Sequence, residues 1–85
     1  MNDSLMMHLI KAIADIAIFL EFSSDSVLNP DASMGALEQL SAELQLLDRT
    51  DCEVVIHQFR RISKNYEDEQ MAQFVESLPE TLGLS

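Results

Sequence analysis

The sequence predicts an all-α protein, a small four-helix bundle that is mostly antiparallel and has a hydrophobic N-terminal helix at its centre. Apolar residues recur at three- and four-residue spacing in four separate stretches. The breaks between these stretches are only a few residues long, which favours antiparallel neighbours. No segment alternates between polar and apolar residues for long enough to form a strand, and Val54–Ile56 is the only β-branched run.

The first stretch predicts a helix over about 4–22. His8, Lys11 and Asp15 lie at i, i+3 and i+7 and mark one narrow polar stripe on a helix that is otherwise apolar. Such a helix is usually buried by several neighbours, so we place it at the centre of the bundle. A bundle of this size leaves part of it uncovered, which indicates either a homodimer or a partner that covers it. Three residues at its start can act as the cap: Asn2, Asp3 and Ser4.

The second helix is predicted over about 30–48. Asn29 supplies a capping side chain, and Pro30 suits the first helical position because its missing N–H has no helical partner there. Val27 and Leu28, just before this start, are expected to hold the connection against the core.

The third helix is predicted over about 51–64. Thr50 and Glu53, three residues apart, match a capping box that opens this helix. Its last turns carry cations, which the helix dipole favours. Four residues form its expected inner face: Cys52, Val55, Phe59 and Ile62.

The fourth helix is predicted over about 67–78. It begins with acidic residues, and Pro79 is expected to stop it because proline cannot donate the next helical hydrogen bond. In the tail that follows, Leu82 and Leu84 are expected to pack back onto the core.

Length and composition predict a single helical domain over 1–85, since a chain of 85 residues cannot divide its buried surface among separate cores. The single Cys52 excludes an intramolecular disulfide framework and fits a reducing compartment. The residues before the first helix lack the positive region of a signal peptide, and Lys11 and Asp15 argue against a transmembrane helix. We therefore expect a soluble, cytoplasmic protein that does not enter a membrane.

The sequence contains no nucleophile, metal or phosphate motif, so we predict neither an enzyme nor a cofactor. One short string resembles a known site. Asp25-Ser26-Val27 is similar to the attachment site of acyl carrier proteins, which are also small, acidic and four-helical. In that family the serine opens the second helix, whereas here Pro30 follows four residues later. An acyl-carrier-like protein is therefore the less favoured alternative.

The net charge of −10 results from fifteen acidic and five basic residues. A field of this sign repels nucleic acid and anionic lipid and favours a cationic partner. The alternative interpretation is that acidic charge keeps a small apolar protein in solution.

Four strings spread over most of the chain carry a broader resemblance: FLEFS over 19–23, LNPDA over 28–32, ALEQL over 36–40 and FVESLPETLGL over 74–84. The chain resembles small acidic bacterial immunity proteins encoded beside secreted polymorphic toxins, including those of type VI secretion and Rhs effectors. The resemblance implies a protein that binds a cognate toxin domain in the cytoplasm and blocks its active site or substrate groove. It carries over no binding residues, because such interfaces differ between pairs.

Two acidic groups are our candidates for contact with a basic toxin domain, because opposite charge speeds association and contributes specificity. Tyr66 is the best aromatic anchor, since a few buried apolar or aromatic residues supply most of the binding energy. The alternative function is a homodimeric structural or regulatory module. The acidic candidates are, in the first group, Glu67, Asp68, Glu69 and Glu76, and, in the second, Asp25 and Asp31.

Overall fold

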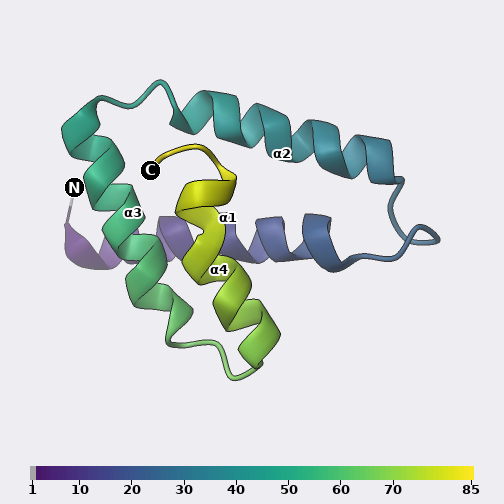
Figure 1. Cartoon of the computed structure of the whole chain (residues 1–85). Helices are drawn as coiled ribbons and strands as arrows, with labels where there is room; N and C mark the ends of the chain where they lie inside the picture. The colour runs from purple at the N-terminus through teal and green to yellow at the C-terminus, as the bar shows by residue number, and fades with distance from the viewer. Residues whose placement is uncertain (1) are drawn as a thin grey trace.

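The computed structural model describes residues 2–85. These residues form four helices and no strand: α1 (Asp3–Phe22), α2 (Pro30–Leu44), α3 (Arg49–Ser63) and α4 (Glu69–Thr81). Figure 1 shows α1 and α2 as one antiparallel pair, and α3 and α4 as a second pair that runs across the first. The predicted mostly antiparallel four-helix bundle is confirmed, and its N-terminal helix α1 contacts each of the other three helices.

Helix α1 uses small side chains on its inner face. Its Asn2 cap accepts a 2.7 Å hydrogen bond from the Leu5 N–H. Ala14 and Ala17 have no exposed surface, which lets the crossing helices approach closely. At its C-terminal end, Phe22 meets Phe74 of α4 edge to face, with ring centroids 5.4 Å apart.

The core lies where α3 and α4 cross α1. Helix α2 contributes no fully buried residue and packs against the outside of this core through partly buried leucines. The core therefore depends mainly on the second helix pair. The most deeply buried large side chains of the core are Phe59, Ile62, Val75, Leu78 and Leu82.

The boundary between α2 and α3 differs from the prediction. Helix α2 ends at Leu44 rather than at residue 48, because the N–H groups of Leu46 and Leu47 bond to carbonyls only three residues back and tighten the turn. Helix α3 begins at Arg49 rather than at residue 51. The Asp48 carboxylate accepts a 2.8 Å hydrogen bond from the Asp51 N–H, so Asp48 is the N-cap of α3. The prediction that a capping box of Thr50 and Glu53 opens this helix was wrong.

Helix α4 also differs from the predicted 67–78. It begins at Glu69, because Asp68 caps it by accepting from the Met71 N–H at 3.0 Å. It continues through the buried Pro79 to Thr81. A proline this near the end costs the helix one hydrogen bond, while burial of its ring adds to the core.

A glycine closes α4. Gly83 has φ +73° and follows the Leu82 cap, and the Leu84 N–H reaches the Pro79 carbonyl at 2.8 Å, as in a Schellman motif. The Leu82 carbonyl accepts from the Ser41 hydroxyl at 2.7 Å and from the Gln45 amide at 2.9 Å, which holds α2 to this end. The expected packing of Leu82 and Leu84 against the core is confirmed.

The connection between α1 and α2 projects from one end of the first helix pair (Figure 1). Val27 does not hold it to the core, because 66% of its surface is exposed. The Ser33 hydroxyl instead donates to the Leu20 carbonyl and joins the start of α2 to the end of α1. Within residues 2–85, no helix combines the length and the hydropathy that a membrane crossing requires.

Candidate partner-binding surfaces

The second acidic group lies at the projecting α1–α2 connection and at the start of α2. Asp25 is exposed in the turn, and Asp31 is exposed in the first turn of α2. Asn29 shapes this start by accepting hydrogen bonds from the backbone of Asp31 at 2.8 Å and of Ala32 at 3.2 Å. The capping of α2 therefore holds the backbone of Asp31, while Asp25 is exposed in the turn before the cap.

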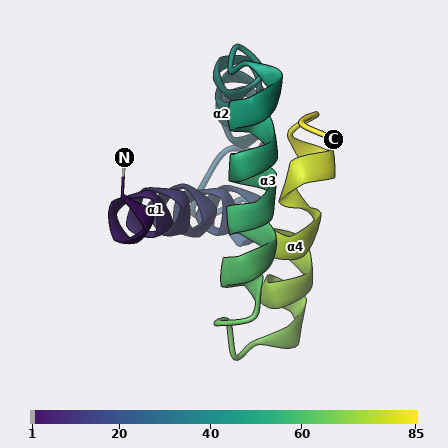
Figure 2. The same ribbon diagram turned by 90° about the vertical axis from the view of Figure 1, so that its left-hand side faces the viewer.

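The first acidic group surrounds the start of α4 and continues along this helix. Glu67 and Asp68 precede the helix, Glu69 opens it, and all three are exposed. Glu76 lies seven residues after Glu69 on the same face of α4. Both views show the α3–α4 connection at a different corner of the molecule from the α1–α2 connection (Figures 1 and 2), so the two acidic groups form separate surfaces.

Glu76 borders a cationic strip of α3. It lines a surface hollow together with three residues of α3 and with Lys64, the residue that follows this helix. Arg60 bonds to Glu80 at 3.0 Å and Arg61 bonds to Asp3 at 3.0 Å, so these cations support the contacts of α3 with α4 and α1. The strip contains His57, Arg60, Arg61 and Lys64.

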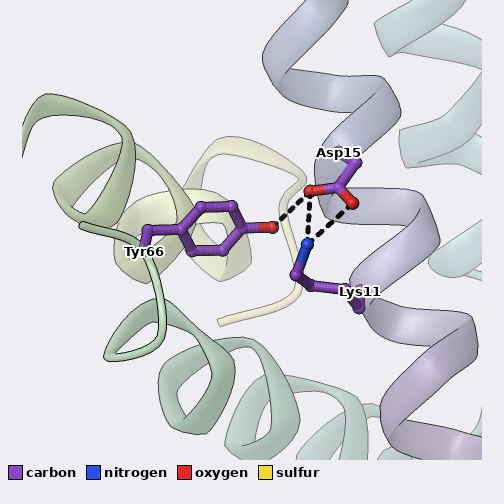
Figure 3. Close-up of polar contacts among 3 residues, drawn as sticks. All are labelled: Lys11, Asp15 and Tyr66. Carbon is purple, nitrogen blue, oxygen red and sulfur yellow. Dashed lines mark hydrogen bonds and ion pairs between the residues drawn. The ribbon is translucent and has the colours of Figure 1, made fainter. Parts of the chain in front are cut away.

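Tyr66 belongs to a polar cluster with two residues of α1 rather than to the acidic surface. Its hydroxyl donates a 2.6 Å hydrogen bond to Asp15, and the Lys11 ammonium lies 2.8 Å from the same carboxylate and 4.9 Å from the centre of the Tyr66 ring (Figure 3). The ring is half-buried. The polar stripe of α1 thus receives the α3–α4 connection, and the Tyr66 hydroxyl already has a partner.

The cluster shifts the pKa values of both acids. Burial raises the pKa of Tyr66, and the hydrogen bond to the Asp15 carboxylate raises it further because that bond requires the neutral phenol. Burial also acts to raise the pKa of Asp15. The hydrogen bonds from Lys11 and Tyr66, together with the positive charge of Lys11, outweigh this effect, and the pKa of Asp15 is lowered.

None of the predicted acidic residues takes part in an ion pair between side chains of residues 2–85. Such ion pairs engage Asp3, Asp15, Glu53 and Glu80. The other eleven of the fifteen acidic side chains form no ion pair with a side chain of residues 2–85. The negative charge counted in the sequence persists on the folded surface.

An apolar stripe runs along the outer face of α1. Its residues recur at alternating spacings of four and three, and its four large members are about half exposed. This alternation of four and three is a heptad pattern that was readable in the sequence and that the prediction of an all-round apolar helix overlooked. We call these residues the α1 stripe: Leu5, Leu9, Ala12, Ile16 and Phe19.

A groove of about 410 Å³ adjoins the α1 stripe. Leu9, Ile13 and Val54 line it, together with Leu47 from the α2–α3 connection. Its lining is mainly apolar, so the groove extends the stripe from α1 towards α3.

No three His, Cys, Asp or Glu side chains of residues 2–85 gather where they could hold a metal ion. The Ser26 hydroxyl bonds to Ser24 at 2.8 Å within the α1–α2 connection, four residues before α2 begins at Pro30. Ser26 therefore does not open the second helix, as it would in an acyl carrier protein.

Comparison of the chain with protein-family models, curated proteins and solved structures finds no match.

Proposed function

We propose that this protein is an immunity protein that binds a basic cognate toxin domain in the cytoplasm and occludes its active site or substrate groove. One observation supports the proposal above others: the predicted acidic residues are all exposed and form no ion pair with side chains of residues 2–85. Unpaired carboxylates attract a cationic partner over a distance and favour its correct orientation. Residues already neutralised within the fold would contribute little to either effect.

The α1–α2 connection is the better of the two acidic surfaces for direct contact. Val27, two residues after Asp25, is 66% exposed, and Met34 is 62% exposed three residues after Asp31 on the same face of α2. Exposed apolar side chains next to carboxylates supply the two components of a specific interface, apolar anchors and a polar rim. At the other surface the Tyr66 hydroxyl is bonded within the fold.

The shape of this connection suits occlusion. It projects from the end of the α1–α2 pair (Figure 1), and active sites are concave. A toxin that acts on nucleic acid or nucleotides needs cations around its site to hold phosphate groups. The carboxylates of Asp25 and Asp31 on the projecting connection take the place of those phosphates. The acidic residues at the start of α4 add to the long-range attraction of the basic toxin domain.

The test is co-expression with the product of a neighbouring toxin gene. We expect growth to be restored and the two proteins to elute together on gel filtration, with affinity falling as salt is added. The double variant Asp25→Asn, Asp31→Asn should weaken the complex and the rescue. The matched control is the double variant Glu38→Gln, Glu43→Gln, which removes the same charge from exposed positions elsewhere on α2.

Failure to restore growth, together with no complex on gel filtration, would refute the immunity function. Equal weakening by both double variants would show that overall charge matters and would reject the α1–α2 connection as the contact.

A further inference from the structure

We propose that the α1 stripe is the contact through which two copies of this protein pair, with their α1 helices antiparallel. Leu5, Leu9 and Ile16 are 48%, 48% and 59% exposed. In Figure 2 the view is roughly down the axis of α1, and the other three helices lie to one side of it. The stripe therefore lies on a face that a second helix can reach.

The spacing of the stripe fits a helix of the same kind. Positions 5, 9, 12, 16 and 19 alternate by four and three residues, the pattern of an antiparallel or parallel two-helix seam. In the antiparallel register, Leu5 of one copy packs against Ile16 of the other, and Leu9 packs against Ala12. A twofold axis repeats both layers, so one stripe supplies both sides of the contact. The small Ala12 lets the two helices approach closely near this axis.

The flanks of the stripe favour the antiparallel orientation. His8 and Asp15 are seven residues apart and line one flank, while Met6, Ile13 and Leu20 line the other at the same spacing. Antiparallel pairing sets like flank against like flank, so the His8 imidazole of each copy lies beside the Asp15 carboxylate of the other. Parallel pairing would place the polar flank against the apolar one and leave Asp15 beside Leu20.

Charge also points to this face. Two copies that each carry −10 repel one another, so a stable pair needs a contact free of acidic side chains at its centre. The stripe consists only of apolar side chains. On its apolar flank, the groove lined by Leu47 and Val54 offers further apolar surface to the second copy, with Asp51 as the single acidic residue of its lining. Asp25 and Asp31 lie beyond the C-terminal end of α1, so pairing leaves the acidic α1–α2 connection accessible.

Analytical ultracentrifugation across the micromolar range tests the pairing. We expect a concentration-dependent mass that approaches twice that of one chain, and stronger association as salt is added, because salt screens the repulsion between acidic copies. Ile16→Glu should abolish the dimer while circular dichroism retains the helix content. The control Met34→Glu makes the same kind of change at a 62% exposed site on α2 and should leave the dimer intact.

A wild-type chain that remains monomeric over this range, or an Ile16→Glu variant that still dimerises, would overturn the proposal. Orientation is tested in a Cys52→Ser background by mixing a tagged Leu9→Cys chain with an untagged Ala12→Cys chain under mild oxidation. Antiparallel pairing predicts the mixed disulfide, whereas dominant like-with-like disulfides would refute it. Salt separates the two proposals, since toxin binding weakens with salt while pairing strengthens.

Discussion

The hydroxyl of Tyr66 donates a 2.6 Å hydrogen bond to the carboxylate of Asp15, 51 residues earlier in the chain. This bond joins the α3–α4 connection to the middle of α1 (Figure 3). Lys11 completes the cluster from one turn before Asp15. The polar stripe predicted on α1 is therefore a point of attachment for the second helix pair.

Tyr66→Phe should lower the free energy of unfolding by about 1 kcal/mol, because it removes one hydrogen bond to a charged acceptor and leaves the ring in place. Urea denaturation followed by circular dichroism measures the change. Combining Tyr66→Phe with Asp15→Asn completes a double-mutant cycle. If the two single effects simply add, the bond contributes nothing to stability.

The phenol of Tyr66 should ionise at higher pH in the folded protein than in the unfolded chain. Its pKa is raised from the ordinary 10.0, by burial first and then by the hydrogen bond to Asp15. The resulting stabilisation is fully present below pH 10 and is lost as the pH rises through the folded pKa. Since Tyr66 is the single tyrosine, its ultraviolet phenolate absorbance in buffer and in urea reports both states without ambiguity. Asp15→Asn should bring the two titrations closer together.

Stability should also fall on the acid side as Asp15 is protonated. Its pKa is lowered from 3.8, so its contribution is complete above that value and is lost as the pH falls through the lower pKa of the folded state. Urea midpoints measured between pH 6 and pH 3 should decline less steeply for Asp15→Asn than for the wild type. Parallel curves for the two proteins would contradict this assignment.

Replacing each of the two glycines by alanine should change the free energy of unfolding in opposite directions. Gly83→Ala should destabilise by about 1–2 kcal/mol, because φ is +73° and the added methyl meets the Gln45 side chain. Gly35→Ala should stabilise by about 0.4–1 kcal/mol, because Gly35 lies within α2 and nothing is within 4 Å of the added methyl. Thermal and urea unfolding of both variants measure this contrast. Stabilisation by Gly83→Ala would contradict the helix ending described above.

Leu78→Ala should cost about 2–5 kcal/mol, because Leu78 is fully buried in the core and its removal leaves a cavity. Leu46→Ala changes the same side chain where 78% of its surface is exposed, and should cost less than about 0.5 kcal/mol. Equal losses of unfolding free energy for the two variants would show that the core has been placed wrongly.

Local chemistry made most of the helices predictable. Asn29 and Pro30 determined the start of α2, and the apolar spacing of Val55, Phe59 and Ile62 identified the buried face of α3. Errors arose where two local signals competed. Asp48 and Thr50 are both good caps, and Asp48 prevailed because the chain turns at Leu46 and Leu47 before it.

The candidate surfaces were predictable to different degrees. Exposed carboxylates such as Asp25 and Glu67 could be anticipated, since charged side chains are seldom buried. The bonding of Tyr66 to Asp15 could not, because no local pattern links residues so far apart in sequence.

The sequence by itself determined an acidic, four-helical chain, because helix periodicity, capping and charge depend on residues within a few positions of one another. Only the tertiary structure decided which side of α1 is covered. Ile10, Ala14 and Ala17 face the core, while Leu9 and Ile16, equally apolar, remain outside. Periodicity cannot make this choice on a helix that is apolar nearly all round, because the crossing of α3 and α4 selects the buried side.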